Sequence, residues 1–465
     1  MPLRVDANCD NPYHHGMKFG FESEKLLYDL KDDSIFHGVF RLVDALSDYV
    51  TFHGEDVPER VTNEFVLNMV EINTLASPSQ REVIEDYLLL YQIVTDVSYR
   101  ERVVPLPLGA VPFLFTPNMV PRWPYYVQNS ILSGKRLKDW ALSPKSPLAD
   151  AGNCAGLHTH IEIECLPEFL VFSKELVHKH NMGLMLTPMT AFSASPYFYE
   201  EHSAHSMRAH RYYHRVYEKF PLNGALPPVM STSEEVLRYT LSGINHWIEA
   251  GTQIGFDRED LVKLTSKKGA NWSMIRWNRT WNTIELRCLE SDRVDLDIGK
   301  FIWVAGAMKR LDLKGEALEP EVLTTQSRLD EKMIDEAFNV HGGRVSILPT
   351  VAIHELTSRA ILKGLHDPWV ERYLHRLATF ARDGVDENCL SVFEILKKAL
   401  DSRRTTTIDI LEATGNASSL TQQQCIPILR DLIQKERTAL AALRTEFPNV
   451  IFKKKSDLFP RLPKK

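Results

Sequence analysis

KFGFESEKLL, residues 18–27, is the stretch that decides how the chain folds around its candidate site. Phe19 and Phe21 alternate with small or acidic residues, and this period of two is typical of a β-strand, in which successive side chains point to opposite faces. Glu22 and Glu24 therefore project from one face, with about 6.6 Å between their Cα atoms, while the two phenylalanines occupy the other face. The stretch predicts a strand with one core face and one carboxylate face.

Three further runs repeat this alternation: VEINT (residues 70–74), GLHTHIEIE (156–164) and NTIELRCLE (282–290). Their ionisable faces carry Glu71 and Asn73 in the first run, His158, His160, Glu162 and Glu164 in the second, and Glu285 and Arg287 in the third. A single acidic pair of this kind is usually the solvent-facing half of a sheet. Four strands dominated by carboxylates and histidine, with almost no lysine, instead predict a site.

Carboxylates that lie side by side repel one another, and their pKa values rise unless a cation holds them ionised. Mg²⁺ and Mn²⁺ prefer carboxylate oxygens and water, and sites that hold nucleotide phosphates leave part of the metal's shell for them. We therefore predict Mg²⁺ or Mn²⁺ together with a triphosphate such as ATP. Zinc is the weaker choice because histidine and cysteine do not dominate the set. For the histidine-rich run His202–His214 three interpretations stay open: a separate zinc site, a substrate-binding loop or an exposed helix.

The order of elements favours an α+β fold. The strand-like runs, Lys18–Leu27, Val66–Thr74, Leu157–Cys165 and Thr283–Leu289, are separated by segments with helical periodicity such as Arg81–Val97. Beyond Gly315–Pro320 the pattern becomes almost wholly helical, over Leu329–Phe338, Val351–Leu365, Val370–Arg382, Cys389–Asp401 and Ile426–Thr445. We predict a catalytic domain over residues 1–315 and a helical C-terminal region over 316–465 that packs on it.

Composition excludes several classes of function. The chain has 465 residues, a formal net charge of -6 and a pI near 6.3, so it offers no general attraction to nucleic acid or to anionic membranes. The six cysteines form no CxxC pair, which fits a reducing cytosol. The N-terminal residues do not resemble a signal peptide, and prolines interrupt the apolar run Val103–Val120. We expect a cytoplasmic protein without a membrane span, and we leave open whether it forms a homo-oligomer.

Several separated segments together resemble the second glutamate-cysteine ligase family, the carboxylate-amine ligases with a glutamine-synthetase-like fold. GFESE is similar to that family's opening G-x-E-x-E strand, VEINT to its next acidic strand, GLHTHI to its G-x-H-x-H strand and IELR to its late E-x-R strand. FSASPY and FPLNGALPPVM resemble its middle loops. The resemblance covers residues 15 to 300 and rests on the ordered set, since each motif alone is weak.

The resemblance implies a curved antiparallel sheet that forms a funnel, with ATP entering one end and amino-acid-like substrates the other. By position, Glu22, His158 and Glu285 would hold the metal that bridges the transferred phosphate. Glu24, Glu64 and Glu71 would hold the metal on the substrate side. Arg287 would then face the phosphoryl group that is transferred.

Further roles follow for residues around these ligands. Arg276, Arg279 and Arg287 are candidates for ATP phosphate contacts, and Arg208 or Arg211 for a substrate carboxylate, because arginine binds carboxylates in a bidentate way. His160 is either a substrate or phosphate contact or a buried hydrogen-bonded residue. Glu162 is either the base that deprotonates the amine or the partner of a nearby arginine. Two positions depart from the family: Glu162 replaces a small residue, and Trp277 replaces a proline.

The predicted function is an ATP-dependent carboxylate-amine ligase that forms an amide bond, for which a γ-glutamyl bond is one candidate, through an acyl phosphate. Its partners would be a small-molecule carboxylate, an amino acid such as glutamate, and an amine. Two alternatives stay open. A guanidino-kinase-like phosphotransferase would stop after phosphoryl transfer, and a nucleotide-binding regulatory protein would not catalyse at all.

Overall fold

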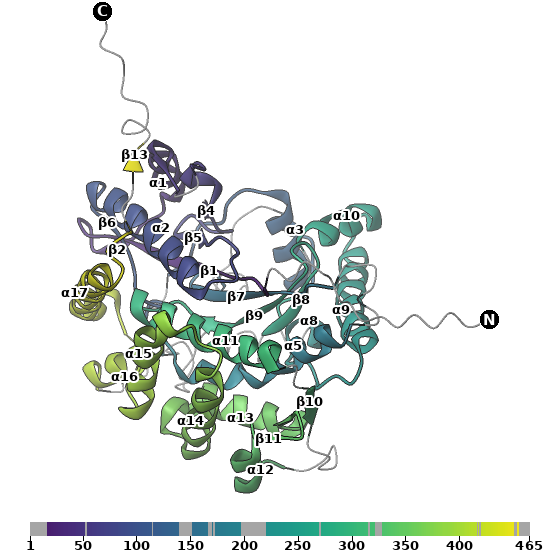
Figure 1. Ribbon diagram of the computed structural model, residues 1–465. Helices are drawn as coiled ribbons and strands as arrows, with labels where there is room; N and C mark the ends of the chain where they lie inside the picture. Colours follow the sequence, from purple (N-terminus) through teal and green to yellow (C-terminus); the bar gives the residue numbers. More distant parts are fainter. Residues whose placement is uncertain are drawn as a thin grey trace, which may run out of the picture.

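The computed structural model describes residues 16–51, 54–113, 115–138, 151–165, 170, 173–196, 220–268, 271–314, 317–320, 328–415, 417, 420–450 and 453–454. Its centre is an eight-stranded sheet, and helices surround that sheet (Figure 1). No described helix has both the length and the apolar character needed to cross a membrane.

The central sheet is antiparallel throughout. Its strands are β1 (Phe19–Asp29), β2 (Ser34–Ile35), β4 (Val61–Asn63), β5 (Met69–Asn73), β6 (Val103–Pro105), β7 (Gly156–Glu162), β8 (Ile275–Asn278) and β9 (Thr283–Glu290). The order is β4-β5-β1-β7-β9-β8, and β2 and β6 pair with β1. The α+β class and the large antiparallel sheet are confirmed, while the curvature and the funnel stay predictions.

The four predicted strands form, with shifted ends. The second is shorter than the predicted run because residues 64–68 connect β4 to β5 instead of extending β5. Alternation places Phe19 and Phe21 on the buried face of β1, each only 1% exposed. Val70 and Ile72 of β5 are fully buried. The core faces predicted from period two are therefore confirmed.

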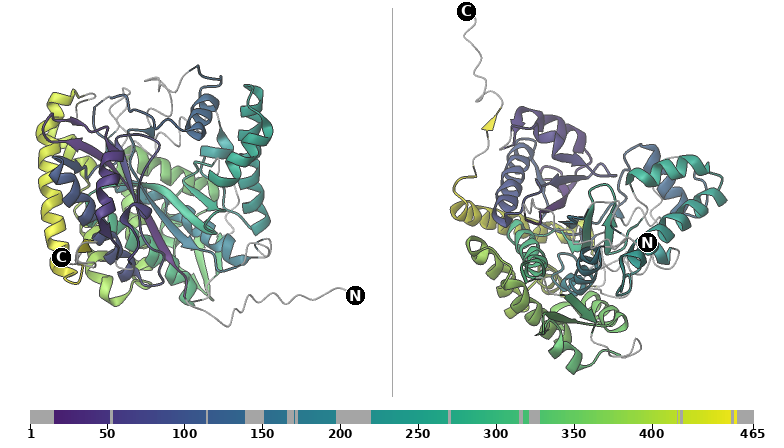
Figure 2. Two further views of the ribbon diagram at one scale, coloured as in Figure 1. Left: turned by 90° about the horizontal axis from the view of Figure 1, so that it is seen from above. Right: turned by 45° about the vertical axis from the view of Figure 1, so that its right-hand side comes forward.

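The helices before the C-terminal region are α1 (Val39–Ala45), α2 (Gln80–Arg100), α3 (Trp123–Leu132), α5 (Lys174–Met185), α8 (Pro221–Gly224), α9 (Ser233–Gln253), α10 (Arg258–Lys268) and α11 (Val294–Lys314). Helices α2, α11 and α5 contact the strands of the sheet. The Phe21 ring of β1 lies 4.9 Å from the Phe301 ring of α11, so the phenylalanine face is the one that these helices cover. Helices α9 and α10 gather beside β8, at the opposite end of the sheet from α17 (Figure 2).

The C-terminal helices are α12 (Glu331–Glu336), α13 (Thr350–Lys363), α14 (Pro368–Arg382), α15 (Leu390–Asp401), α16 (Thr406–Ala413) and α17 (Gln422–Glu446). Helices α14, α15 and α17 pack on α11. The Trp303 ring of α11 stacks at 5.4 Å on Phe393 of α15, so both parts of the chain contribute to one core. The proposed domain boundary falls just after α11 and stays a prediction.

The described residues of the C-terminal region are mostly helical, but the region also contains strands that were not expected. A three-stranded sheet forms there from β10 (Ala317–Pro320), β11 (Val340–His341) and β12 (Arg344–Ile347), and β10 runs parallel to β12. These strands have two to four residues, too few for alternation to be recognised in the sequence. A further short pair joins β3 (Tyr49–Val50) to β13 (Lys453–Lys454), close to the C-terminus.

Candidate active site on the acidic face of the sheet

The register of three neighbouring strands brings the first predicted set of ligands together. Glu22 of β1 lies opposite His158 of β7, and His160 of β7 lies opposite Glu285 of β9. The His158 Nδ1 atom is 2.9 Å from Glu22 Oε2 and 3.8 Å from Glu285 Oε1. One ligand atom from each of Glu22, His158 and Glu285 lies within 4.8 Å of the others. We call these three residues the phosphate-side trio, after the side of the site on which the resemblance leads us to expect the phosphate.

The second predicted set converges beside it. Glu24 of β1 lies opposite Glu71 of β5, and Glu64 follows β4 directly. One carboxylate oxygen from each of Glu24, Glu64 and Glu71 lies within 4.8 Å of the others, and we call this set the substrate-side trio. The His158 Nε2 atom is 3.7 Å from Glu24 Oε1, so this histidine lies between the two trios.

Positive side chains surround the phosphate-side trio. The fully buried Glu285 accepts a hydrogen bond from Arg276 Nε at 2.7 Å and also pairs with Arg287. Burial alone would raise the pKa of Glu285, but the two arginines hold that pKa well below its ordinary value. Glu22 likewise has a pKa far below normal, because His160 and His158 outweigh the effect of burial. This trio is therefore anionic at neutral pH, and its arginines are in reach of an anionic ligand.

His160 belongs to the same cluster. Its Nε2 atom is 3.2 Å from Glu22 Oε1, and its Nδ1 atom is 3.0 Å from the Thr283 hydroxyl. Burial alone would lower the pKa of His160, but Glu22 and then Glu285 raise it. His160 therefore contacts the predicted metal ligand Glu22 and can orient its carboxylate.

The substrate-side trio has a different charge balance. Burial raises the pKa of Glu71 well above its ordinary value, and the nearby Glu22 and Glu64 carboxylates raise it further. Glu64 and Glu71 are partly exposed, whereas Glu24 is buried. Three carboxylates at this spacing are the donor set that Mg²⁺ or Mn²⁺ prefers, and such an ion would hold all three ionised. The residues present therefore fit a divalent metal.

Glu162 and Arg279, two further predicted residues, are held by partners outside the trios. Glu162, at the end of β7, accepts a hydrogen bond from the Lys18 backbone N–H at 3.1 Å, and its carboxylate is 3.5 Å from Lys18 Nζ. The ion pair foreseen for Glu162 exists, but with a lysine in place of an arginine. Arg279 lies exposed in the turn between β8 and β9, with its guanidinium 6.0 Å from the centre of the Trp277 ring. Arg208, Arg211 and the run His202–His214 lie outside the described residues.

Two amides hold the predicted ligands and were not assigned a role from the sequence. Asn278 Nδ2 donates to Glu285 Oε2 at 2.8 Å, and Asn73 Nδ2 donates to Glu71 Oε1 at 2.9 Å. Each asparagine lies two residues from a predicted site residue of its strand, Arg276 or Glu71. The period of two had already placed Asn73 on the ionisable face with Glu71, and the same alternation would have found Asn278 beside Arg276.

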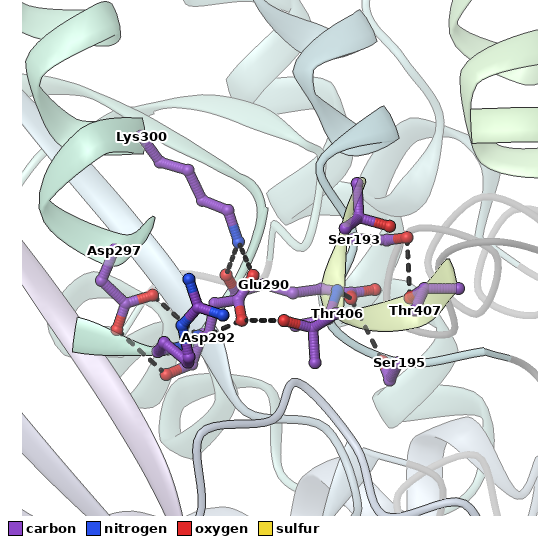
Figure 3. Close-up of polar contacts among 12 residues, drawn as sticks. Ser193, Ser195, Glu290, Asp292, Asp297, Lys300, Thr406 and Thr407 are labelled. Carbon is purple, nitrogen blue, oxygen red and sulfur yellow. Dashed lines mark hydrogen bonds and ion pairs between the residues drawn. The ribbon is translucent and has the colours of Figure 1, made fainter. Parts of the chain in front are cut away.

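A buried ionic network supports the strands from the opposite face (Figure 3). Lys25 of β1 pairs with Asp297 of α11 at 2.7 Å, and both side chains are fully buried. Lys300 pairs with Asp292 at 3.1 Å, and the Thr406 hydroxyl donates to Asp292 at 2.6 Å. The network joins β1, the end of β9, α11 and α16, and so fixes the strands that carry Glu24 and Glu285.

Comparison with known proteins shows the fold. No protein-family model and no curated protein matches the chain. Among solved structures it is similar to a bifunctional glutathione synthetase from Pasteurella multocida, with a TM-score of 0.51 and 11% identity over 91% of this chain and 53% of that chain. A glutamate-cysteine ligase from Francisella tularensis, in complex with AMP, gives a TM-score of 0.49 and 12% identity over 94% of this chain and 93% of that chain. The chain shares the fold of the synthetase and spans about half of its length.

Proposed function

We propose that the protein is an ATP-dependent carboxylate-amine ligase that forms an amide bond through an acyl phosphate. The observation that supports this proposal is the meeting of two trios of candidate metal ligands on one sheet face, with Arg276 and Arg287 paired to the first trio. The fold shared with the bifunctional glutathione synthetase is in accord with it. The proposed carboxylate is an amino acid such as glutamate, with a γ-glutamyl bond as the product linkage.

The positions of the arginine side chains indicate which trio would bind the ATP phosphates and which would bind the carboxylate substrate. Arg276 and Arg287 lie at the phosphate-side trio, so we place the ATP phosphates there, because arginine binds phosphate in a bidentate way. Arg279, in the exposed turn after Arg276, would meet the nucleotide only at the periphery. The carboxylate substrate would then lie at Glu24, Glu64 and Glu71. Divalent ions held by the two trios would supply positive charge that shields the phosphates and the reacting carboxylate.

A carboxylate needs activation because it is already anionic and resists attack by an amine. In the first step a carboxylate oxygen bonds to the γ-phosphorus of ATP, the bond to the β-phosphate oxygen breaks, and ADP leaves. In the second step the amine attacks the acyl carbon, phosphate departs, and the amine nitrogen loses a proton. Arg287 and Arg276 would bind the equatorial oxygens of the transferring phosphoryl group, on which negative charge is spread.

The proton from the amine needs an acceptor, and Glu162 is our proposed base. Its carboxylate is about one third exposed, and it lies on the same face of β7 as His158 and His160. The ion pair with Lys18 holds the carboxylate in a defined position. The segment with Arg208 and Arg211, outside the described residues, stays our proposal for a contact with the substrate carboxylate.

The test is a screen for Mg²⁺-dependent ADP release with ATP and pools of amino acids and amines, followed by mass spectrometry of the product. We expect an amide product, and a hydroxamate when hydroxylamine replaces the amine. Arg287→Ala should reduce the rate about a hundredfold, because one electrostatic contact to the transition state is worth on the order of 3 kcal/mol. Arg238→Ala, which removes an exposed arginine paired with Glu234 on α9, is the matched control and should leave the rate unchanged.

Other outcomes of the same screen contradict the proposal. A phosphorylated guanidine in place of an amide would identify a phosphotransferase of the guanidino-kinase kind. No Mg²⁺-dependent ADP release with any pool would point to a nucleotide-binding regulatory protein.

A further inference from the structure

Arg60, directly before β4, ties the strands beside the substrate-side trio to helix α2. Its Nε atom donates to the Asn73 carbonyl at the end of β5 at 3.0 Å, and its Nη2 atom donates to Asp86 of α2 at 2.9 Å. The Arg60 carbonyl in turn accepts the Asn73 backbone N–H at 2.8 Å. Both the backbone N–H and the carbonyl of Asn73 are therefore bound to Arg60.

The ion pair with Asp86 anchors this arrangement in the core. The Asp86 side chain is fully buried, and the Arg60 side chain is only 15% exposed. Asp86 Oδ2 also accepts the Leu75 backbone N–H at 2.7 Å, and Arg60 Nη1 donates to Glu55 at 3.0 Å. Leaving either charge of a buried ion pair unpaired costs free energy, so both side chains are held in one geometry. The chain from Asn73 to Leu75 is therefore fixed where it leaves β5.

Asn73 connects this ion pair to the site. Its Nδ2 atom donates to Glu71 Oε1 at 2.9 Å, and its Cα atom lies opposite that of Glu22 in the pairing of β5 with β1. Asn73 therefore lies between a member of the substrate-side trio and a member of the phosphate-side trio. An amide bound to one oxygen of Glu71 orients the carboxylate, in the way that groups around a metal site commonly orient its ligands.

We propose that Arg60 is a positioning residue for the substrate-side trio, which acts through Asn73 to hold Glu71 in the orientation that binds a divalent ion. The inference rests on the proposed function, because the ion at this trio belongs to that function. Within the described part of the chain, the side-chain hydrogen bonds of Arg60 go to Glu55, Asn73 and Asp86. Its influence on Glu71 therefore passes through Asn73.

The test is a double-variant cycle on Mn²⁺ affinity without ATP, in which electron paramagnetic resonance measures free Mn²⁺. Arg60→Lys keeps a positive charge for Asp86 but cannot reproduce the three donor directions of the guanidinium group. Asn73→Ala keeps the backbone contacts with Arg60 but removes the amide that holds Glu71. We expect each variant to bind Mn²⁺ about tenfold more weakly than the wild type. The double variant should lose no more than Asn73→Ala alone, because both changes act on the same contact.

Arg238→Lys, the same substitution at an exposed arginine on α9, is the matched control and should bind Mn²⁺ as the wild type does. Unchanged affinity in Arg60→Lys would overturn the inference. Losses that multiply to about a hundredfold in the double variant would overturn it as well, because Arg60 would then act on the fold without Asn73.

A second variant decides the question if thermal melts show that Arg60→Lys is unfolded. Asp86→Asn weakens the anchor of Arg60 without leaving a buried anion, and it should weaken Mn²⁺ binding severalfold in the wild type but not in Asn73→Ala. Equal losses in both backgrounds would again overturn the inference. A wild type that binds no Mn²⁺ would contradict the metal sites of the proposed function, and this inference with them. Failure of the cycle alone would leave the proposed function intact.

Discussion

Glu71 shows most directly what the site requires of a single residue. Its carboxylate lies within 4.8 Å of Glu24 and Glu64, and it is hydrogen-bonded by the Asn73 amide. Burial and then the nearby Glu22 and Glu64 carboxylates raise the pKa of Glu71, so ionising it costs free energy that a bound divalent ion would offset. Glu285 shows the opposite case, because two arginines already stabilise its charge. The two trios thus differ in how strongly they need a cation.

A metal-binding experiment tests this difference without measuring activity. We expect Glu71→Gln to weaken Mn²⁺ binding at least tenfold, because one of three anionic ligands becomes a neutral amide. Electron paramagnetic resonance of free Mn²⁺ in a titration measures the effect. Glu234→Gln, an exposed carboxylate on α9, should bind Mn²⁺ as the wild type does. Equal affinity of both variants would exclude the substrate-side trio as a metal site.

At the scale of elements, the two faces of the sheet carry charged groups of different kind. One face carries the trios, and the other meets α2, α11 and α16 through the network around Lys25 and Asp297. Asp297 also accepts hydrogen bonds from Ser23 at 3.2 Å and from Tyr87 at 3.1 Å. The strand that presents Glu22 and Glu24 to one side is therefore fixed from the other side by charged groups.

Removing one partner of this network should lower the stability of the folded protein. We expect Lys25→Met to lower the free energy of unfolding by about 3–5 kcal/mol, because Asp297 would stay buried without its cation. The double variant Lys25→Met with Asp297→Asn should recover part of the loss, since no buried charge is left unpaired. Urea denaturation of the wild type, the single variants Lys25→Met and Asp297→Asn and the double variant measures this. A double variant less stable than the sum of the two single changes would contradict the explanation.

Helix α17 makes the stability of the fold depend on pH, through Glu436 at its contact with α2 and α11. Glu436 of α17 is 6% exposed, pairs with the Tyr91 hydroxyl of α2 and accepts the Val294 backbone N–H of α11 at 2.9 Å. Burial raises the pKa of Glu436 from 4.5 to about 7. The folded protein therefore binds this proton more tightly than the unfolded chain. Its contribution to stability is complete below pH 4.5 and is lost as the pH rises through about 7.

Glu436→Gln should remove this dependence, because glutamine imitates the protonated carboxyl group. We expect the variant to gain stability over the wild type between about pH 5 and pH 8, by about 3 kcal/mol at the upper end. Thermal melts of both proteins across that range provide the measurement. Parallel stability curves for the two proteins would show that Glu436 does not titrate there.

At the scale of the whole molecule, both parts of the chain contribute to one large core cluster against the central sheet. The C-terminal helices share that core through contacts such as Trp303 on Phe393, and α16 reaches the network behind β9 through Thr406. The chain shares its fold with the bifunctional glutathione synthetase over about half of that enzyme's length. The C-terminal region supports the strands that carry the site, although no trio member belongs to it.

The amino-acid sequence by itself determined which residues share a face. In β1, β5, β7 and β9 the alternation of side chains follows from local backbone geometry, so Glu22, Glu71, His158 and Glu285 could be assigned to one kind of face without knowledge of their neighbours. Long helices such as α14 and α17 were found for the same reason, because their period is local.

Only the tertiary structure decided which of these faces meet. The order β4-β5-β1-β7-β9-β8 and its register create the two trios and place Arg276 and Asn278 on Glu285. Strand pairing depends on contacts between residues far apart in the chain, and alternation carries no information about them. The same limit explains why the lysine partner of Glu162 and the short strands β10 to β12 were not foreseen.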